Sequence, residues 1–81
     1  MSTGHAVRQV LRDYGRLGLP VEELSDDDDL YLAGMTSQAS VNVMLGLEAT
    51  LDIEFPEHLL RKSTFASIRA ITGAVTGLRQ S

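Results

Sequence analysis

The sequence contains no cysteine, and this absence excludes several kinds of chemistry at once. Without thiols, the chain has no disulfide, no thiolate-bound metal and no thiol nucleophile. A small secreted domain usually needs disulfides for stability, so we expect a cytoplasmic location. The opening residues, MSTGHAVRQV, also lack the long apolar core of a signal peptide, and no apolar run reaches the length of a membrane span. We therefore expect neither a targeting segment nor a membrane as partner.

Basic residues are also few, with seven Lys and Arg against eleven Asp and Glu and a net charge of -4. They are scattered and form no patch with interleaved aromatic residues, so we expect no nucleic acid as partner. Six of the eleven acids lie within eight residues, namely Glu22, Glu23 and Asp26 to Asp29. Consecutive aspartates lack the alternate spacing of a calcium loop. We interpret this acidic run as a solvated loop and predict no metal site.

The length of 81 residues predicts a single domain over residues 1–81, with its core at about 5–76. A chain of this size cannot enclose a drug-sized site of roughly 300 Å³ without emptying its core. We therefore expect no catalytic cleft, so the protein is not expected to be an enzyme. Nothing in the sequence requires more than a monomer.

The first helix is predicted from Ser2 or Thr3 to Tyr14, because apolar residues recur every three or four positions and Gly15 follows. Residues 15–34 contain Pro20 and three glycines and have no helical period, which predicts a long ordered crossover with one capped turn at Ser25 and Asp28. The apolar face of the helix should comprise Ala6, Val7, Val10, Leu11 and Tyr14. The crossover should be pinned by Leu17, Leu19, Val21, Leu24, Leu30 and Leu32.

The second helix is predicted to begin at Thr36 or Ser37 and to end near Leu51. At 100° per residue, its inner face should comprise Val41, Met44, Leu47 and Leu51, and its outer face Gln38, Asn42, Gly46 and Ala49. Met35 is interpreted as a small apolar patch beside Ser37.

A short helix over EHLLRK, residues 57–62, is predicted next, with Leu59 and Leu60 directed inward. A last helix should follow, capped by Ser63 or Thr64 and frayed over residues 78–81. Its apolar face should comprise Phe65, Ile68, Ile71 and Val75. No alternating run indicates a strand. The fold class is therefore all-α, a small up-and-down bundle of three main helices plus one short helix.

The hydroxyls of Thr36 and Ser37 lie together at the expected start of the second helix. Taken alone, a serine there is most often only a helix cap. Here Thr36 can cap the helix and leave Ser37 pointing outward, where the helix macrodipole favours an attached anion. The two histidines, His5 and His58, lie elsewhere in the sequence, so no nucleophilic triad and no catalytic residue is predicted.

Three stretches, DDDLYLAGMTS, SVNVMLGLEATLDIEFP and TFASIRAI, resemble the acyl carrier protein family in their order and spacing. In that family an acidic loop and a leucine precede a Gly-x-Asp-Ser motif at the start of the second helix. By position, Gly34 is the motif glycine and Ser37 the serine that carries 4'-phosphopantetheine, with Met35 and Thr36 between them. The resemblance covers about residues 5 to 76 and implies an acyl-carrier-protein-like bundle with this cofactor, supplied from coenzyme A by a phosphopantetheinyl transferase.

The chain departs from the family pattern around Ser37. Thr36 replaces the usual aspartate, and Gln38 replaces the usual apolar residue. The second helix of fatty-acid carriers also bears many carboxylates, whereas here the expected partner-binding stripe is uncharged, which makes fatty-acid synthesis less favoured. That stripe comprises Gln38, Val41, Asn42, Leu45 and Ala49.

The block AGMTSQASVNVMLGLE is similar to a narrower group of carriers, loaded with a small amino acid by stand-alone ligases that resemble the catalytic core of seryl-tRNA synthetases. This resemblance implies a glycyl or alanyl thioester on the arm, an amino acid:[carrier protein] ligase as partner and an unknown downstream acceptor enzyme. Two alternatives stay open. One is an acyl or peptidyl carrier of a fatty-acid, polyketide or nonribosomal peptide pathway, and the other is a carrier-shaped adaptor without a prosthetic group.

Overall fold

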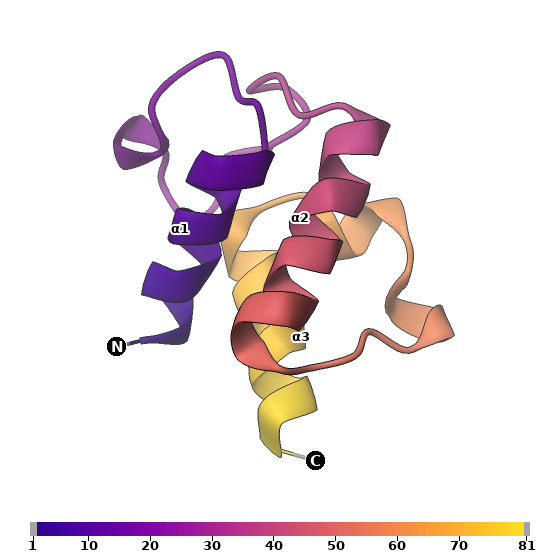
Figure 1. Cartoon of the computed structure of the whole chain (residues 1–81). Helices are drawn as coiled ribbons and strands as arrows, with labels where there is room; N and C mark the ends of the chain where they lie inside the picture. The colour runs from indigo at the N-terminus through magenta and orange to yellow at the C-terminus, as the bar shows by residue number, and fades with distance from the viewer. Residues whose placement is uncertain (1, 81) are drawn as a thin grey trace.

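A computed structural model describes residues 2–80 of the chain, and these residues contain three α-helices and no strand. α1 spans Thr3–Tyr14, α2 spans Ser37–Leu51 and α3 spans Ile68–Gln80. α1 packs against both other helices, and a long crossover connects the end of α1 to the start of α2, both of which lie near the top of the view in Figure 1. The predicted all-α bundle of three main helices is confirmed. Within the described residues, no helix combines the length and apolarity that crossing a membrane requires.

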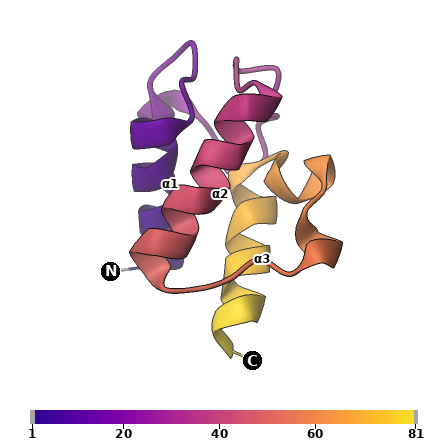
Figure 2. The ribbon, with the colours of Figure 1, turned by 45° about the vertical axis from the view of Figure 1, so that its right-hand side comes forward.

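The core lies between the three helices and is closed at one side by the crossover (Figures 1 and 2). On α1 the predicted apolar face is buried as far as Leu11, but Tyr14 at the end of the helix is 46% exposed. Ser2 caps α1, because its Oγ accepts a hydrogen bond from the His5 N–H at 3.1 Å. The side chains with almost no exposed surface are Val7, Leu11, Leu30, Val43, Leu47, Ile68, Ile71 and Val75.

The crossover is pinned by fewer leucines than the sequence suggests. Val21, Leu24 and Leu30 are buried and Leu17 is partly buried, as predicted. The prediction is wrong for Leu19 and Leu32, which are exposed, Leu32 at 88%. Residues 30–34 form a tight turn, in which the N–H of Ala33 donates to the carbonyl of Leu30 at 3.1 Å. Inside such a turn, residues two apart point to different sides, so Leu30 faces the core and Leu32 the solvent.

The acidic run Asp26 to Asp29 is exposed, in agreement with its interpretation as a solvated loop, and it also accepts hydrogen bonds that tie the crossover to the rest of the chain. Each of the four aspartates accepts a hydrogen bond from the chain itself. The hydrogen bond from Arg69, which also brings a positive charge, lowers the pKa of the Asp27 carboxyl below its ordinary value. The donors are Arg8 to Asp26, Arg69 to Asp27, the Ser25 N–H to Asp28, and the N–H groups of Tyr31 and Leu32 to Asp29. The Asp28 bond is the carboxylate half of the predicted capped turn. No cluster of metal-binding side chains occurs within residues 2–80.

The predicted faces of α2 are only partly correct. Leu47 is buried, and Gln38 and Ala49 are exposed, as predicted, but the inner face is wrong in its rotation about the helix axis. Val41, predicted to face inward, is 45% exposed, whereas Gly46, predicted to face outward, is buried. Met44 and Leu51 are only partly buried. Apolar residues lie on almost every side of this helix, so their pattern does not select one face. The face against the core comprises Ala39, Val43, Gly46 and Leu47, two of which are small enough for α1 to come close.

Gly46→Ala is expected to destabilise the protein by about 1–2 kcal/mol, although alanine is the better helix former. A Cβ at this position would lie 2.7 Å from Cδ2 of Tyr14 and 3.0 Å from Cγ1 of the buried Val10. Gly73→Ala in α3 is the matched control, because a Cβ there has nothing within 4 Å. This control should stabilise by roughly 0.4–1 kcal/mol in urea denaturation. Equal stabilisation by both changes would contradict the close approach of α1 and α2.

The segment between α2 and α3 forms two 3₁₀ turns, Glu57–Leu59 and Lys62–Phe65, in place of one short helix; a third 3₁₀ turn, Val21–Glu23, lies in the crossover. Leu59 is partly buried, but Leu60 is 49% exposed, so its predicted inward direction is wrong. The ring of Phe65 packs on that of Phe55 with centroids 5.4 Å apart, which anchors the segment to the core.

α3 begins later than predicted and is capped by Ser67, whose Oγ accepts from the Ala70 N–H at 3.1 Å, instead of by Ser63 or Thr64. Thr64 is buried within the second 3₁₀ turn, which excludes it from the cap. The helix continues through Gln80, so the predicted fraying is wrong for residues 78–80, while Ser81 lies outside the described residues. Phe65, Ile68, Ile71 and Val75 are all buried as predicted, although Phe65 lies in the second 3₁₀ turn and not on α3.

Candidate functional site

The turn before α2 depends on a glycine at position 34. Gly34 has φ +115°, a backbone conformation that side chains with a Cβ rarely adopt. A Cβ here would also lie 3.0 Å from the backbone nitrogen of Gly18, whose N–H donates to the Ala33 carbonyl at 2.9 Å. Gly34 therefore allows two parts of the crossover to meet directly ahead of the helix.

Met35 anchors this turn from within the core. It is only 3% exposed, so its interpretation as an apolar patch beside Ser37 is wrong. Its N–H donates to the Leu30 carbonyl at 3.0 Å, which closes the turn. The core thus holds the backbone immediately before the two hydroxyl residues.

Thr36 caps α2 and Ser37 points outward, as the sequence predicts. The Oγ1 of Thr36 accepts a hydrogen bond from the Ala39 N–H at 3.0 Å and caps α2. Ser37, the first residue of the helix, is exposed, and its hydroxyl has no hydrogen-bond partner among residues 2–80. Its carbonyl accepts from the Ser40 Oγ at 2.7 Å, so the backbone is held while the hydroxyl stays free.

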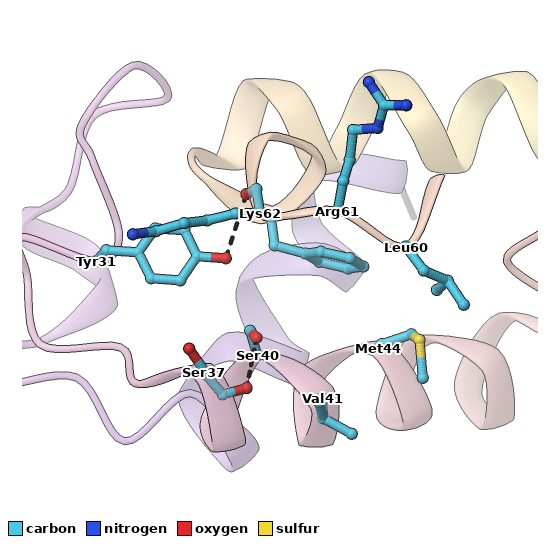
Figure 3. Close-up of a pocket in the computed structure, with 9 residues that line it drawn as sticks. Tyr31, Ser37, Ser40, Val41, Met44, Leu60, Arg61 and Lys62 are labelled. Atoms are coloured by element: carbon cyan, nitrogen blue, oxygen red, sulfur yellow. Dashed lines mark hydrogen bonds between the residues drawn. The ribbon is translucent and has the colours of Figure 1, made fainter. Parts of the chain in front are cut away.

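A groove of about 350 Å³ lies beside Ser37, between α2 and the segment that carries Leu60, Arg61 and Lys62 (Figure 3). The limit of roughly 300 Å³ expected from the length of the chain concerned an enclosed site. This groove can exceed that volume because it lies at the surface and takes little space from the core. The sequence does not reveal it, since its two walls come from segments far apart in the chain. The lining residues are Tyr31, Ser37, Ser40, Val41, Met44, Leu60, Arg61, Lys62 and Phe65.

The groove lining brings no carboxylate or imidazole to Ser37. His5 and His58 are both exposed and neither lines the groove. A serine hydroxyl needs an adjacent base to act as a nucleophile. The side chains that line the groove therefore supply no such base to Ser37.

The uncharged stripe of α2 is largely accessible. Leu45 is 52% exposed, Gln38, Val41 and Ala49 are also exposed, and Asn42 is half-buried. Glu48 is not part of this stripe, and its carboxylate accepts a hydrogen bond from the Phe55 N–H at 2.9 Å. The helix that begins with Ser37 thus presents an uncharged and partly apolar surface.

Comparison with known proteins agrees with this geometry. The family model described as the phosphopantetheine attachment site matches residues 6–75. An aminoacyl carrier protein of Agrobacterium fabrum is 49% identical over 69 residues, which cover 85% of this chain and 83% of the relative.

Two solved structures from Agrobacterium tumefaciens have the same fold. One is the carrier protein in a crystal structure with an engineered Bradyrhizobium japonicum glycine:[carrier protein] ligase and ATP, matched with a TM-score of 0.89 and 46% identity over 91% of this chain and 96% of that one. The other is a solution structure with a TM-score of 0.76 and 44% identity over 95% of this chain and 93% of that one. The chain therefore belongs to the phosphopantetheine attachment-site family and is a homologue of aminoacyl carrier proteins, which hold the group on which separate enzymes act.

Proposed function

We propose that this chain carries an aminoacyl group, glycyl or alanyl, as a thioester on a 4'-phosphopantetheine arm bonded to Ser37. The observation that supports this role is the exposed and unpartnered hydroxyl at the first residue of α2. Gly34, Met35 and Thr36 position it through the turn, the core anchor and the cap respectively. We assign the carrier unit to residues 5–76, within the single domain 1–81.

The residues around Ser37 fit such an arm. The start of α2 favours an adjacent negative charge, because the first N–H groups of a helix have no partner within it. The groove beside Ser37 has the apolar side chains of Val41, Met44 and Leu60 along one part and the cation of Lys62 at another. An anionic root followed by an uncharged chain matches this lining. When bound, the arm supplies the thiol that holds the amino acid.

Attachment and loading both need other proteins. A phosphopantetheinyl transferase would supply the base and transfer the arm from coenzyme A, with the Ser37 oxygen forming the new phosphodiester and adenosine bisphosphate leaving. A glycine:[carrier protein] ligase would then use ATP to load the aminoacyl group onto the thiol. The complex of the 46% identical carrier with such a ligase supports this role. A downstream acceptor enzyme would remove the aminoacyl group. Because ATP and coenzyme A are supplied in the cytoplasm, we propose that location.

We further propose that the uncharged stripe of α2 binds the ligase. Gln38, Val41, Asn42, Leu45 and Ala49 lie along the helix that positions Ser37. A surface without charges binds by shape, apolar contact and hydrogen bonds, so its affinity should depend weakly on salt.

Ser37→Ala should abolish attachment of the arm. After incubation with coenzyme A and a phosphopantetheinyl transferase, the intact mass of the unmodified protein should increase by one arm, whereas the variant should show no increase. Ser40→Ala is the matched control, because it removes a hydroxyl one turn further along the same groove and should still accept the arm. An increase in the mass of Ser37→Ala would exclude Ser37 as the attachment site. No increase in the parent protein would favour the adaptor without a prosthetic group.

A further inference from the structure

Tyr31 and Lys62, 31 positions apart in the sequence, form a pair at one end of the groove beside Ser37 (Figure 3). The Tyr31 hydroxyl donates to the backbone carbonyl of Lys62 at 3.2 Å, and the Tyr31 N–H donates to Asp29 at 2.9 Å. The Lys62 ammonium lies 4.8 Å from the centroid of the Tyr31 ring. The ring is therefore held through its hydroxyl, the backbone of Tyr31 is held by Asp29, and the ammonium rests against the face of the ring.

The positive charge of Lys62 has no carboxylate partner within the described part of the chain. The ion pairs found there use Arg8, Arg12 and Arg69, all bound to the crossover. An ammonium has three N–H donors, and contact with an aromatic face leaves donors available. Lys62 is thus a positioned cation that can accept an anionic partner.

The groove places this cation close to the proposed attachment point. Ser37 and the Tyr31–Lys62 pair lie on opposite walls at the same end, and the Ser37 side chain points from α2 toward Tyr31 (Figure 3). Arg61 also lines the groove, but its guanidinium points away from α2. Val41, Met44 and Leu60 form the other end of the groove. The groove therefore has a cationic end at Ser37 and an apolar end beyond it.

We propose that Lys62, positioned by the ring of Tyr31, binds the phosphodiester of the arm after its attachment to Ser37. This inference rests on the proposed function and adds to it a binding residue for the root of the arm. A phosphodiester keeps its negative charge across the physiological pH range, and lysine binds phosphate as a compact point charge. The start of α2 attracts the same group from the opposite wall. The uncharged part of the arm can then contact the apolar end of the groove.

The test compares the unmodified protein with Lys62→Gln and with Arg61→Gln, a matched removal of the neighbouring cation that points away from α2. Each protein is converted with coenzyme A and a phosphopantetheinyl transferase, and its mass verifies attachment. The change in the ring resonances of Tyr31 between the apo and the arm-bearing form is then measured by NMR. Contacts between the methyl groups of the arm and those of Val41 and Met44 are recorded on the same samples.

The unmodified protein and Arg61→Gln should show the same change at Tyr31 and the same contacts, and Lys62→Gln should lose more than half of both. Raising the salt from about 50 to about 500 mM should weaken the contacts in the unmodified protein as well, because the ion pair is exposed. The inference would be overturned if attachment of the arm changed the Tyr31 resonances equally in Lys62→Gln and Arg61→Gln. It would also be overturned if the Tyr31 resonances of the unmodified protein did not change although its mass includes the arm. Either result would leave the proposed function intact. If no protein gains the arm, the proposed function fails and this inference fails with it.

Discussion

Leu30→Ala is expected to lower the free energy of unfolding by about 2.5–5 kcal/mol. The side chain has no exposed surface, and its removal would leave a cavity where the crossover meets the helices. The backbone of Leu30 is equally engaged, because its N–H donates to the Ala66 carbonyl at 2.8 Å and its carbonyl accepts from Met35. For a chain of this length the total stability is roughly 4–12 kcal/mol, so this single change would remove a large part of it.

Leu32→Ala is the matched control for this result. It removes the same atoms two residues later in the same turn, from a side chain that is 88% exposed. The free energy of unfolding should change by less than about 0.5 kcal/mol. Urea denaturation followed by circular dichroism measures both variants. Similar losses at the two positions would contradict the orientation of the turn that leads to Ser37.

Leu45→Glu should weaken binding of the ligase by about thirtyfold or more, the loss typical of a central interface residue. Leu45 is 52% exposed in the middle of the uncharged stripe, where a carboxylate would be buried on docking without a partner. The probe is the engineered Bradyrhizobium japonicum glycine:[carrier protein] ligase, which forms a complex with a carrier 46% identical to this chain. Calorimetric titration measures the Kd.

Thr50→Glu provides the control for charge. Thr50 is also exposed on α2, but it lies roughly 140° around the helix axis from Leu45 and roughly 80° or more from the other residues of the stripe. The Thr50→Glu substitution adds the same charge to the same helix and should leave the Kd within about twofold of the value for the unmodified protein. An unchanged Kd for Leu45→Glu would exclude this face. A steep loss of affinity with salt in the unmodified protein would instead indicate Asp26 to Asp29 as the contact.

Local signals in the sequence are sufficient to predict much of the candidate site. The start of α2 follows from two neighbouring hydroxyls, whereas Gly34 was identified only through the family resemblance, and the structure supplies the physical reason for it, a φ of +115°. Hydrogen bonds between a cap and its helix join residues three positions apart, so the sequence contains both partners in one short window. For this reason Thr36 as cap and Ser37 as the free hydroxyl were predictable without any knowledge of packing.

Surface and core residues of the same type were harder to separate. α2 has apolar residues around most of its circumference, and its buried face is decided by the approach of α1 at Gly46. Leu30 and Leu32 are the same residue type in the same loop, yet only the former is buried. The hydrophobicity of a side chain indicates that its burial is favourable in free energy, but it does not indicate which neighbouring element will cover that side chain.

The amino-acid sequence by itself determined the three helices, the Thr36 cap of α2 and the hydroxyl at Ser37, because these depend on interactions between residues a few positions apart. The tertiary structure alone decided the groove, the position of Lys62 over Tyr31 and the ties from Arg8 and Arg69 to the acidic run. Those contacts join residues 18 to 42 positions apart, and their formation depends on how the helices pack.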